Sequence, residues 1–150
     1  MKRKRIIRDR KILTLAKLGN GTYTTVNGKR CIVYSRRKGY AVTMNIEKEK
    51  YGLVNIKNQT VIHNKYDMCT YPQRGIIFVM KKDLWGFADE TGKLLCPCEY
   101  THIYSFKGDV AITRRGTSYG LITKKGEVIL KCKYCRETVL YERRRHFNKM

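Results

Sequence analysis

The sequence is poor in acidic residues and in proline, and it has no apolar run long enough for a membrane helix. Twelve Asp and Glu residues stand against 33 Lys and Arg residues, for a formal net charge of +21. Two prolines and a hydrophobic content of 42% exclude a proline-rich disordered linker and are typical of a globular domain. The apolar run near the N-terminus, residues 12–16, is five residues long. A signal peptide needs about 7–15 apolar residues and a membrane helix about 20. We therefore expect no export signal and interpret the protein as cytoplasmic.

Signatures of catalysis are also missing. The three histidines, His63, His102 and His146, are scattered, and no Ser-His-Asp or Cys-His pattern can be assigned around them. A GxxxxGK[ST] phosphate loop is absent, and the few carboxylates form no pair at a catalytic spacing. No helix-turn-helix, zinc-finger or RNA-recognition signature is present. These absences predict a protein that is not an enzyme and that needs no cofactor.

An internal repeat of 34 residues is the strongest positive feature of the chain. An aromatic residue followed directly by glycine occurs at Tyr51-Gly52, Trp85-Gly86 and Tyr119-Gly120. A polar turn, an apolar pair and a tyrosine follow each time, and these tyrosines keep the same period at Tyr66, Tyr100 and Tyr134. Such a period indicates a repeat architecture, in which each unit is one supersecondary element.

Each unit holds short segments that are typical of β-strands. They are rich in Val, Ile, Tyr and Thr and are separated by polar clusters with glycine. Thr91-Gly92 and Lys125-Gly126 fit hairpin turns, because glycine readily adopts a positive φ, and Asn58 can take this role in the first unit. We predict an all-β protein with about three short antiparallel strands per unit, arranged as an open twisted array or a partly closed, barrel-like or propeller-like form.

These residues resemble the WG-repeat (KWG-type) proteins that are common in bacteria. The resemblance covers residues 39–141, with tyrosine in place of tryptophan in two of the three units. Further matches are Thr91-Gly92-Lys93, Lys125-Gly126-Glu127, Pro97, Tyr100, Phe106 and Gly108. The resemblance implies a β-repeat array used for interaction, generally without a catalytic assignment and without active-site residues.

The chain divides into one domain and two basic ends. Residues 1–18 form a basic N-terminal arm, residues 19–141 a single β-repeat domain, and residues 142–150 a basic tail. Within the domain, residues 19–38 contain an Asn27-Gly28 hairpin turn and are predicted to form a degenerate capping unit, followed by three units over residues 39–134. The apolar stretch at residues 138–141 can form a last strand or a short helix.

The repeated aromatic and glycine residues have two possible roles. A large ring in each unit can bury apolar area between units, and the adjacent glycine allows a neighbouring backbone to come close. Alternatively, the rings form an exposed ladder that stacks on bases or sugars. We favour the first role, with a repeat core made of Tyr51, Gly52, Trp85, Gly86, Tyr119, Gly120, Tyr66, Tyr100 and Tyr134.

The positive charge is concentrated at the two ends of the chain. Residues 1–50 contain 15 basic and 3 acidic residues, residues 51–100 contain 6 and 5, and residues 101–150 contain 12 and 4. Charge of this density destabilises a compact state unless an acidic partner neutralises it, and nucleic acid is the first candidate. The interleaved tyrosines suit stacking on single-stranded bases. The alternative is a protein–protein interaction scaffold that docks on an acidic protein, and an anionic membrane surface is a weaker third option.

The candidate partner-binding residues lie in predicted hairpin loops and in the two tails. If the units stack regularly, the loops form a basic ridge along one edge. These residues are Lys81, Lys82, Arg114, Arg115, Lys124 and Lys125 in the loops, Lys2, Arg3, Lys4 and Arg5 in the arm, and Arg143, Arg144 and Arg145 in the tail.

Four of the six cysteines have a spacing that allows a zinc site. Cys96, Cys98, Cys132 and Cys135 offer four thiolates. The repeat register indicates a different role for three of them. Cys98 and Cys132 occupy the position of Asn64, and Cys96 occupies the strand position of Ile62 and Leu130. Cysteine in such a place behaves as a small apolar residue. We predict no bound metal and no disulfide framework.

Overall fold

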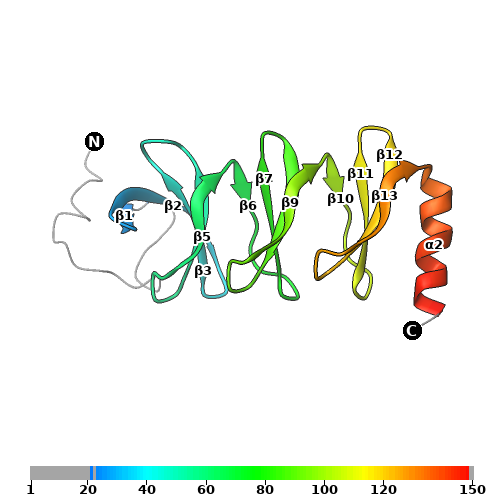
Figure 1. Cartoon of the computed structure of the whole chain (residues 1–150). Coiled ribbons are helices and arrows are strands. Elements are labelled where there is room, and N and C mark those ends of the chain that lie inside the picture. The colour runs from blue at the N-terminus through cyan, green and yellow to red at the C-terminus, as the bar shows by residue number, and fades with distance from the viewer. Residues whose placement is uncertain (1–20, 22, 149–150) are drawn as a thin grey trace.

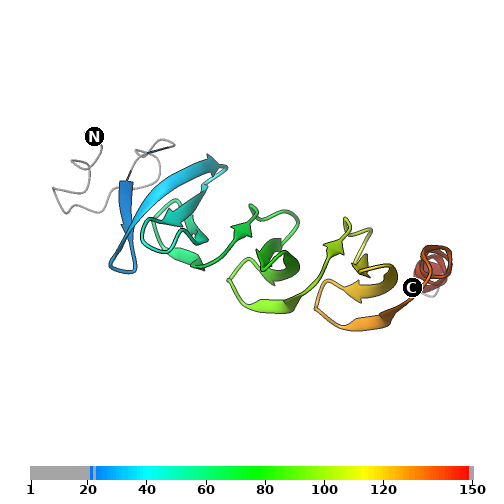
Figure 2. The same ribbon diagram turned by 90° about the horizontal axis from the view of Figure 1, so that it is seen from above.

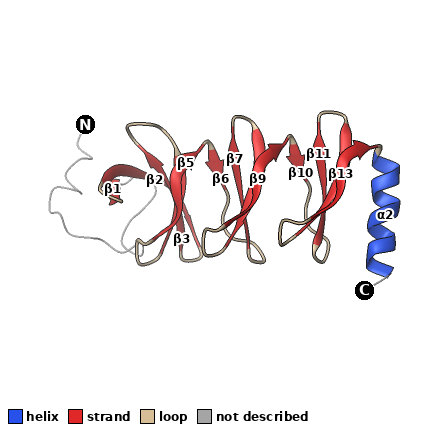
Figure 3. Ribbon diagram, in the orientation of Figure 1, coloured by secondary structure: helices blue, strands red, loops and turns tan. Residues whose placement is uncertain are grey.

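The computed structural model describes residue 21 and residues 23–148. The predicted basic arm at residues 1–18, with Lys2, Arg3, Lys4 and Arg5, lies outside the described residues. The described part contains three antiparallel sheets that follow one another in a row, with one helix at the C-terminal end (Figures 1 and 3). Seen from above, the row is open from end to end (Figure 2). The predicted all-β repeat fold is therefore confirmed, in its open form.

The strands and the helix follow the repeat closely. The first sheet contains β1 Tyr23–Val26, β2 Lys29–Arg37, β3 Tyr40–Asn45, β4 Tyr51–Asn55 and β5 Thr60–Tyr66. The second contains β6 Met68–Cys69, β7 Ile76–Lys81, β8 Leu84–Asp89 and β9 Leu94–Tyr100. The third contains β10 His102–Ile103, β11 Val110–Arg115, β12 Ser118–Thr123 and β13 Val128–Tyr134, and helix α2 spans Arg136–Asn148.

Each repeat unit is one sheet with three main strands, as predicted. The two-residue strands β6 and β10 are additional, and they pair with the first main strand of their unit. In the first sheet β2 takes this place beside β3, and β1 pairs with β2 across the Asn27-Gly28 turn, where both residues have positive φ. Of residues 19–38, expected to form a capping unit, residues 23–37 thus join the sheet of the first unit through these two strands.

The apolar core is a series of interfaces between neighbouring sheets. In the second sheet Ile77 and Val79 pack against the first unit, whereas Ile76 and Phe87 face the third. Because successive side chains of a strand point to opposite faces, both faces of this sheet are buried by a neighbouring unit. This arrangement explains the nearly continuous apolar run of β7, Ile76–Lys81, and it is the packing expected of a linear repeat protein.

Helix α2 covers the face of the last sheet where a further unit would otherwise pack. Val139 is fully buried against Val110, Ile112 and Leu121, and the ring of Phe147 lies close to the backbone of Gly108. The C-terminal stretch therefore forms a helix and not a last strand. The boundary expected between residues 141 and 142 falls inside this helix. In the described part, no helix has the length and apolar character needed to cross a membrane.

The glycine of each aromatic-glycine pair lies under the third strand of its unit. A Cβ at Gly52, Gly86 or Gly120 would lie 2.3–2.5 Å from a carbonyl oxygen of that strand, which is far inside van der Waals contact. The pairing register shifts at this point in all three sheets. The third strand therefore bulges over the glycine, and no residue with a side chain fits there without moving the backbone.

A second glycine position joins the units to each other. Gly92 and Gly126 have φ values of +92° and +89°, as their predicted turns require. A Cβ on them would lie 2.0 Å from the Val61 carbonyl oxygen and 2.1 Å from the Leu95 carbonyl oxygen of the preceding unit. Asn58 is the equivalent residue of the first unit, with φ +61°, and its side chain donates a hydrogen bond to the Thr25 carbonyl in β1 (3.3 Å).

Candidate functional site

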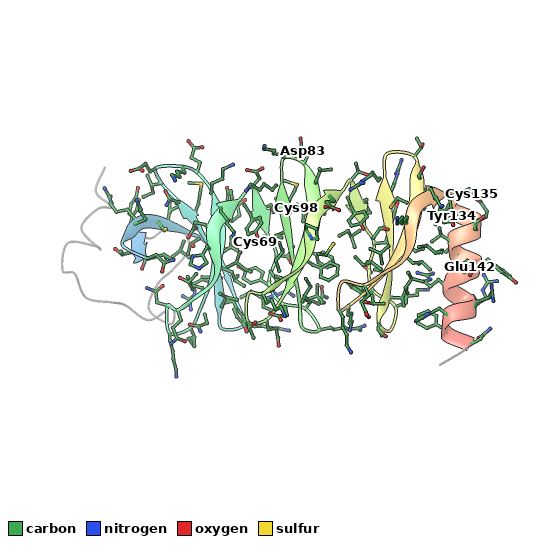
Figure 4. All side chains as sticks on the ribbon, viewed as in Figure 1. Cys69, Asp83, Cys98, Tyr134, Cys135 and Glu142 are labelled. Atoms are coloured by element: carbon green, nitrogen blue, oxygen red, sulfur yellow. The ribbon has the colours of Figure 1, made fainter. Side chains whose placement is uncertain are left out.

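Antiparallel pairing places the turns of every unit on two opposite edges of the array. The β3–β4, β7–β8 and β11–β12 turns share one edge, which we call the upper edge as in Figure 1. The opposite, lower edge carries the β4–β5, β8–β9 and β12–β13 turns and the turns that lead into β3, β7 and β11. Asp83 marks a tip of the upper edge in Figure 4.

The predicted basic loops do not share an edge. Lys81 and Lys82 belong to the β7–β8 hairpin, and Arg114 and Arg115 belong to the β11–β12 hairpin, both at the upper edge. Lys124 and Lys125 lie in the β12–β13 turn at the lower edge. The prediction of a single ridge is therefore wrong, because successive turns of an antiparallel sheet alternate between its two ends.

Two cations at the upper edge are paired with acidic groups of the chain. The Asp67 carboxylate accepts a hydrogen bond from the Lys50 ammonium at 2.5 Å and one from the backbone N–H of Lys82 at 2.7 Å. The hydrogen bond from Lys50 is the main reason that the pKa of Asp67 lies below its usual range. Arg115 forms an ion pair with Glu99 at 3.4 Å.

The two upper-edge arginines are also held by backbone carbonyls and tyrosine rings. The Arg114 guanidinium donates to the Gly116 carbonyl at 2.7 Å and lies 5.6 Å from the ring centre of Tyr119. The Arg115 guanidinium donates to the Glu99 carbonyl at 3.0 Å and lies 5.6 Å from the ring centre of Tyr100. Cation–π contacts of this kind stabilise the pair modestly at exposed sites. Both arginines therefore contribute to packing within the array.

The lower edge carries a longer series of basic side chains, which we call the lower basic row. Every unit contributes to it from both of its lower turns, and all of its members are exposed apart from the half-exposed Lys124. The row consists of Arg37, Lys38, Lys57, Arg74, Lys93, Lys107, Lys124 and Lys125.

Sequence reasoning identified only two members of this row. The missing signal was a basic residue directly before the glycine that opens each unit, at Lys38-Gly39, Arg74-Gly75 and Lys107-Gly108. These pairs are spaced by 36 and 33 residues, so a search for a strict period of 34 does not align them. Their shared position, just before the first main strand of each unit, is seen only when the three sheets are compared in the structure.

The lower basic row has no ion pair within the described residues. The three ion pairs found there join Lys50 to Asp67, Arg115 to Glu99 and Arg145 to Glu142. Four carboxylates also lie at the lower edge, from Asp89, Glu90, Asp109 and Glu127. Asp89 is engaged by its own turn, where the hydroxyl and N–H of Thr91 and the N–H of Lys93 donate to it. These hydrogen bonds, of which the one from the Thr91 hydroxyl has the largest effect, lower the pKa of Asp89.

The tail arginines lie on helix α2, away from the lower turns of the first two units. Arg144 and Arg145 are exposed and Arg143 is half-buried. Arg145 forms an ion pair with Glu142, one helical turn earlier, at 3.2 Å. Glu142 is labelled on the helix in Figure 4.

The rings expected in the repeat core are buried to different degrees. Tyr66 and Tyr100 are buried, at 7% and 9% exposure, and Tyr134 is half-buried. Tyr51, Trp85 and Tyr119 are also half-buried. Tyr51 meets the ring of Tyr34 edge-on at 5.2 Å, and Tyr119 stacks on Tyr104 at 6.4 Å. Within the described residues, no aromatic ring pairs with Trp85.

Two hollows are lined in part by Thr70, in the segment that leads into the second unit. The first, which we call the aromatic hollow, has a volume of about 200 Å³ and is lined by Thr70, Phe78, Trp85, His102 and Ile103. The second, which we call the basic hollow, has a volume of about 540 Å³ and includes two members of the lower basic row. Thr70 lines both. The basic hollow is lined by Arg37, Lys38, Tyr40, Thr70, Tyr71, Pro72, Gln73 and Glu90.

The cysteines occupy the packing positions that the repeat register predicts. Cys96 is buried opposite Phe87, as Ile62 is opposite Leu53. Cys98 and Cys132 lie in the bulge of the third strand, like Asn64, and their thiols contact the Val79 carbonyl (3.6 Å) and the Thr113 hydroxyl (3.3 Å). Asn64 likewise donates to the Thr43 carbonyl at 3.0 Å.

The thiols do not gather at one place. Burial raises the pKa of Cys96 to about 12, whereas a hydrogen bond with Thr138 lowers the pKa of the exposed Cys135. Figure 4 shows Cys135 at the start of α2, apart from Cys98 in the second unit. Within the described residues, no three His, Cys, Asp or Glu side chains come together as metal ligands would.

Comparison with known proteins agrees with the period and the register of these sheets. The model of the WG containing repeat matches at residues 51–85, 85–116 and 119–134, which together make up more than half of the chain. The chain belongs to the WG-repeat family. Each match begins at the aromatic-glycine pair of a unit, and the second match also ends inside the β11–β12 turn. No curated protein and no solved structure matched the chain.

Membership in the WG-repeat family supports a repeat-containing binding or scaffold protein. The geometry shared by the three units places the aromatic residue and its glycine at the start of the second main strand, with the glycine beneath the bulge of the third. That geometry lets the second and third strands of each sheet approach closely, and the turns at the two edges carry many of the charged side chains.

Proposed function

We propose that this WG-repeat protein binds nucleic acid and does not catalyse a reaction. The cations of the lower basic row would contact the phosphates of the nucleic acid. The observation that carries the proposal is the repeated basic side chain directly before each unit, at Lys38, Arg74 and Lys107. These cations are exposed and have no ion pair among the described residues. Phosphate contacts by lysine and arginine are the main source of sequence-independent affinity for nucleic acid.

The spacing of the row suits a long polyanion. Sheets that pack face to face lie about 10 Å apart, so equivalent turns of successive units follow one another at roughly that distance. One strand of duplex DNA carries a phosphate about every 3.4 Å along its axis. A single array can therefore contact several phosphates of one strand, and this geometry discriminates little between sequences. We expect binding that depends on charge and length more than on base sequence.

The test is a binding titration against single-stranded and duplex DNA at several salt concentrations. The logarithm of the association constant should fall with the logarithm of salt by about 0.9 for each neutralised phosphate in duplex DNA and about 0.7 in a single strand. The triple variant Lys38→Asn, Arg74→Asn, Lys107→Gln should flatten the duplex slope by about 2 to 3 units if all three side chains contact phosphates. Asparagine suits Lys38 and Arg74 because both have positive φ.

A matched variant at the upper edge separates position from total charge. Lys48→Gln, Lys81→Gln, Lys82→Asn also removes three exposed cations, and Lys82 has a positive φ like Lys38 and Arg74. It should change the slope by less than about 1 unit, since these cations lie outside the row. Equal effects of the two triple variants would contradict a role for the lower basic row. Weak binding with a shallow slope in the unmodified protein would favour the alternative of a scaffold for an acidic protein.

A further inference from the structure

We infer that the aromatic hollow takes one unstacked base of a single strand, which lies on Trp85 while the adjoining phosphates lie in the basic hollow. This inference rests on the proposed function and specifies its ligand as single-stranded nucleic acid. The first observation concerns the burial and the ring contacts of Trp85. Its equivalents Tyr51 and Tyr119 are each paired with another ring, at 5.2 and 6.4 Å. Trp85 is half-buried and has no ring partner among the described residues.

The walls of the aromatic hollow suit a flat, partly polar ring. Phe78 and Ile103 are apolar, and His102 is an exposed ring on the neighbouring unit. The Thr70 hydroxyl accepts a hydrogen bond from the Phe78 N–H at 3.0 Å, so its own hydrogen is left to donate to a base carbonyl. A volume of about 200 Å³ is smaller than the roughly 300–1,000 Å³ typical of sites for whole drug-sized ligands. The hollow therefore suits a single ring system.

The basic hollow explains why the occupant should be a nucleotide and not an apolar side chain. It shares Thr70 with the aromatic hollow and is lined by Arg37 and Lys38. One carboxylate, from Glu90, also lines it, so two cations face one anion. An aromatic surface beside a cationic one matches a base joined to phosphates, which is the arrangement that single-strand-binding proteins use. A duplex keeps its bases stacked and cannot fill both hollows.

Tryptophan fluorescence gives a direct readout, because Trp85 is the single tryptophan of the chain. The full-length protein is titrated at one low salt concentration with a thymidine oligonucleotide and with an abasic deoxyribose-phosphate oligomer of equal length and charge. The thymidine oligonucleotide should quench the fluorescence and bind about 5- to 100-fold more tightly than the abasic oligomer. Trp85→Leu should remove this difference and leave the affinity for the abasic oligomer unchanged.

Two further variants keep the test independent of folding. Tyr141→Leu removes an exposed ring, 57% accessible, on α2, and it should change neither affinity. His102→Ala removes an exposed ring that lines the aromatic hollow and lies 4.2 Å from the ring of Tyr104, and it should weaken binding of the thymidine oligonucleotide alone, by about 2- to 10-fold. If Trp85→Leu does not fold, the His102 variant and the quenching in the unmodified protein decide the matter.

The possible failures are distinguishable. If both oligomers bind equally well and fluorescence does not change, the base site is wrong while phosphate binding stands. If Trp85→Leu weakens both oligomers equally, the ring acts on the fold and the base site is again wrong. If neither oligomer binds, the proposed function fails and the base site fails with it.

Discussion

The upper edge of the array combines paired cations with exposed ones such as Lys48, Lys81 and Lys82, whereas no member of the lower basic row has an ion pair among the described residues. At the upper edge Lys50, Arg114 and Arg115 each have a partner on the chain. At the lower edge Lys38, Arg74 and Lys107 project from turns in every unit. Packing accounts for the first set. It does not account for the second, because unpaired like charges destabilise a folded chain.

The two edges also differ in how the units touch. The turn glycines Gly92 and Gly126 at the lower edge contact the backbone of the preceding unit, whereas a Cβ at Gly116 in an upper turn would meet no atom within 4 Å. Contact between units thus holds the β8–β9 and β12–β13 turns, which carry Lys93, Lys124 and Lys125, against the preceding unit. Charges on turns held in this way lose less conformational freedom on binding a polymer.

The largest expected effect is a difference between two glycine substitutions. Gly116→Ala and Gly126→Ala both place a side chain at positive φ, at +63° and +89°, which costs roughly 1–2 kcal/mol. Gly126→Ala adds a clash with the Leu95 carbonyl oxygen at 2.1 Å, and overpacking costs roughly 1–3 kcal/mol more. We expect the free energy of unfolding, measured in urea, to fall by about 1–2 kcal/mol for Gly116→Ala and by about 2–5 kcal/mol for Gly126→Ala. Equal losses would contradict the contact between units.

A smaller effect distinguishes two arginines. Arg115→Gln removes an ion pair with Glu99 and a contact with the ring of Tyr100, and it should lower the free energy of unfolding by about 0.5–1 kcal/mol. Arg74→Gln removes a cation without an ion pair in the described part, so the change should stay within about 0.5 kcal/mol of zero. Urea denaturation of both variants at low salt measures the difference. A larger loss for Arg74→Gln would show that the lower basic row stabilises the fold.

The smallest expected effect concerns two aspartates, one at each edge. Both pKa values are lowered, that of Asp67 mainly by Lys50 and that of Asp89 mainly by the Thr91 hydroxyl. A carboxylate whose pKa is lower in the folded state stabilises that state at a pH above the unfolded pKa of about 3.9. This stabilisation decreases as the pH falls below about 3.9, and it is lost once the pH is below the folded-state pKa.

The partners of the two aspartates predict different responses to salt. Added salt screens the Lys50 ammonium but has less effect on neutral donors. We expect the pKa of Asp67 to rise toward its ordinary value with added salt and that of Asp89 to change less, as measured by NMR titration of the carboxyl carbons. A larger rise for Asp89 would contradict this assignment of causes.

Much of the fold follows from local patterns in the sequence. The 34-residue period located the three units, and the polar pairs with glycine located the turns at Thr91-Gly92 and Lys125-Gly126. The register of Cys96 with Ile62 and Leu130 also placed these residues at one strand position. These features are predictable because they depend on the turn chemistry and side-chain alternation of single strands.

The candidate site was predicted only in part. Lys124 and Lys125 were placed in a basic ridge, but Lys81, Lys82, Arg114 and Arg115 lie at the opposite edge. Lys38, Arg74 and Lys107 were missed because loops of unequal length shift them out of the strict period. The hollow at Trp85 was not foreseen either, since it is bounded by His102 and Ile103 of the next unit.

The sequence by itself determined the WG-repeat unit: its period, its strands, its turns and the glycine that follows each aromatic residue. Those depend on interactions between residues close in the chain. Only the tertiary structure decided that the array is open, that α2 closes its last face, and which cations share an edge. Those outcomes depend on how whole sheets stack and on the alternation of strand direction, which bring together side chains that lie a full unit or more apart in the sequence.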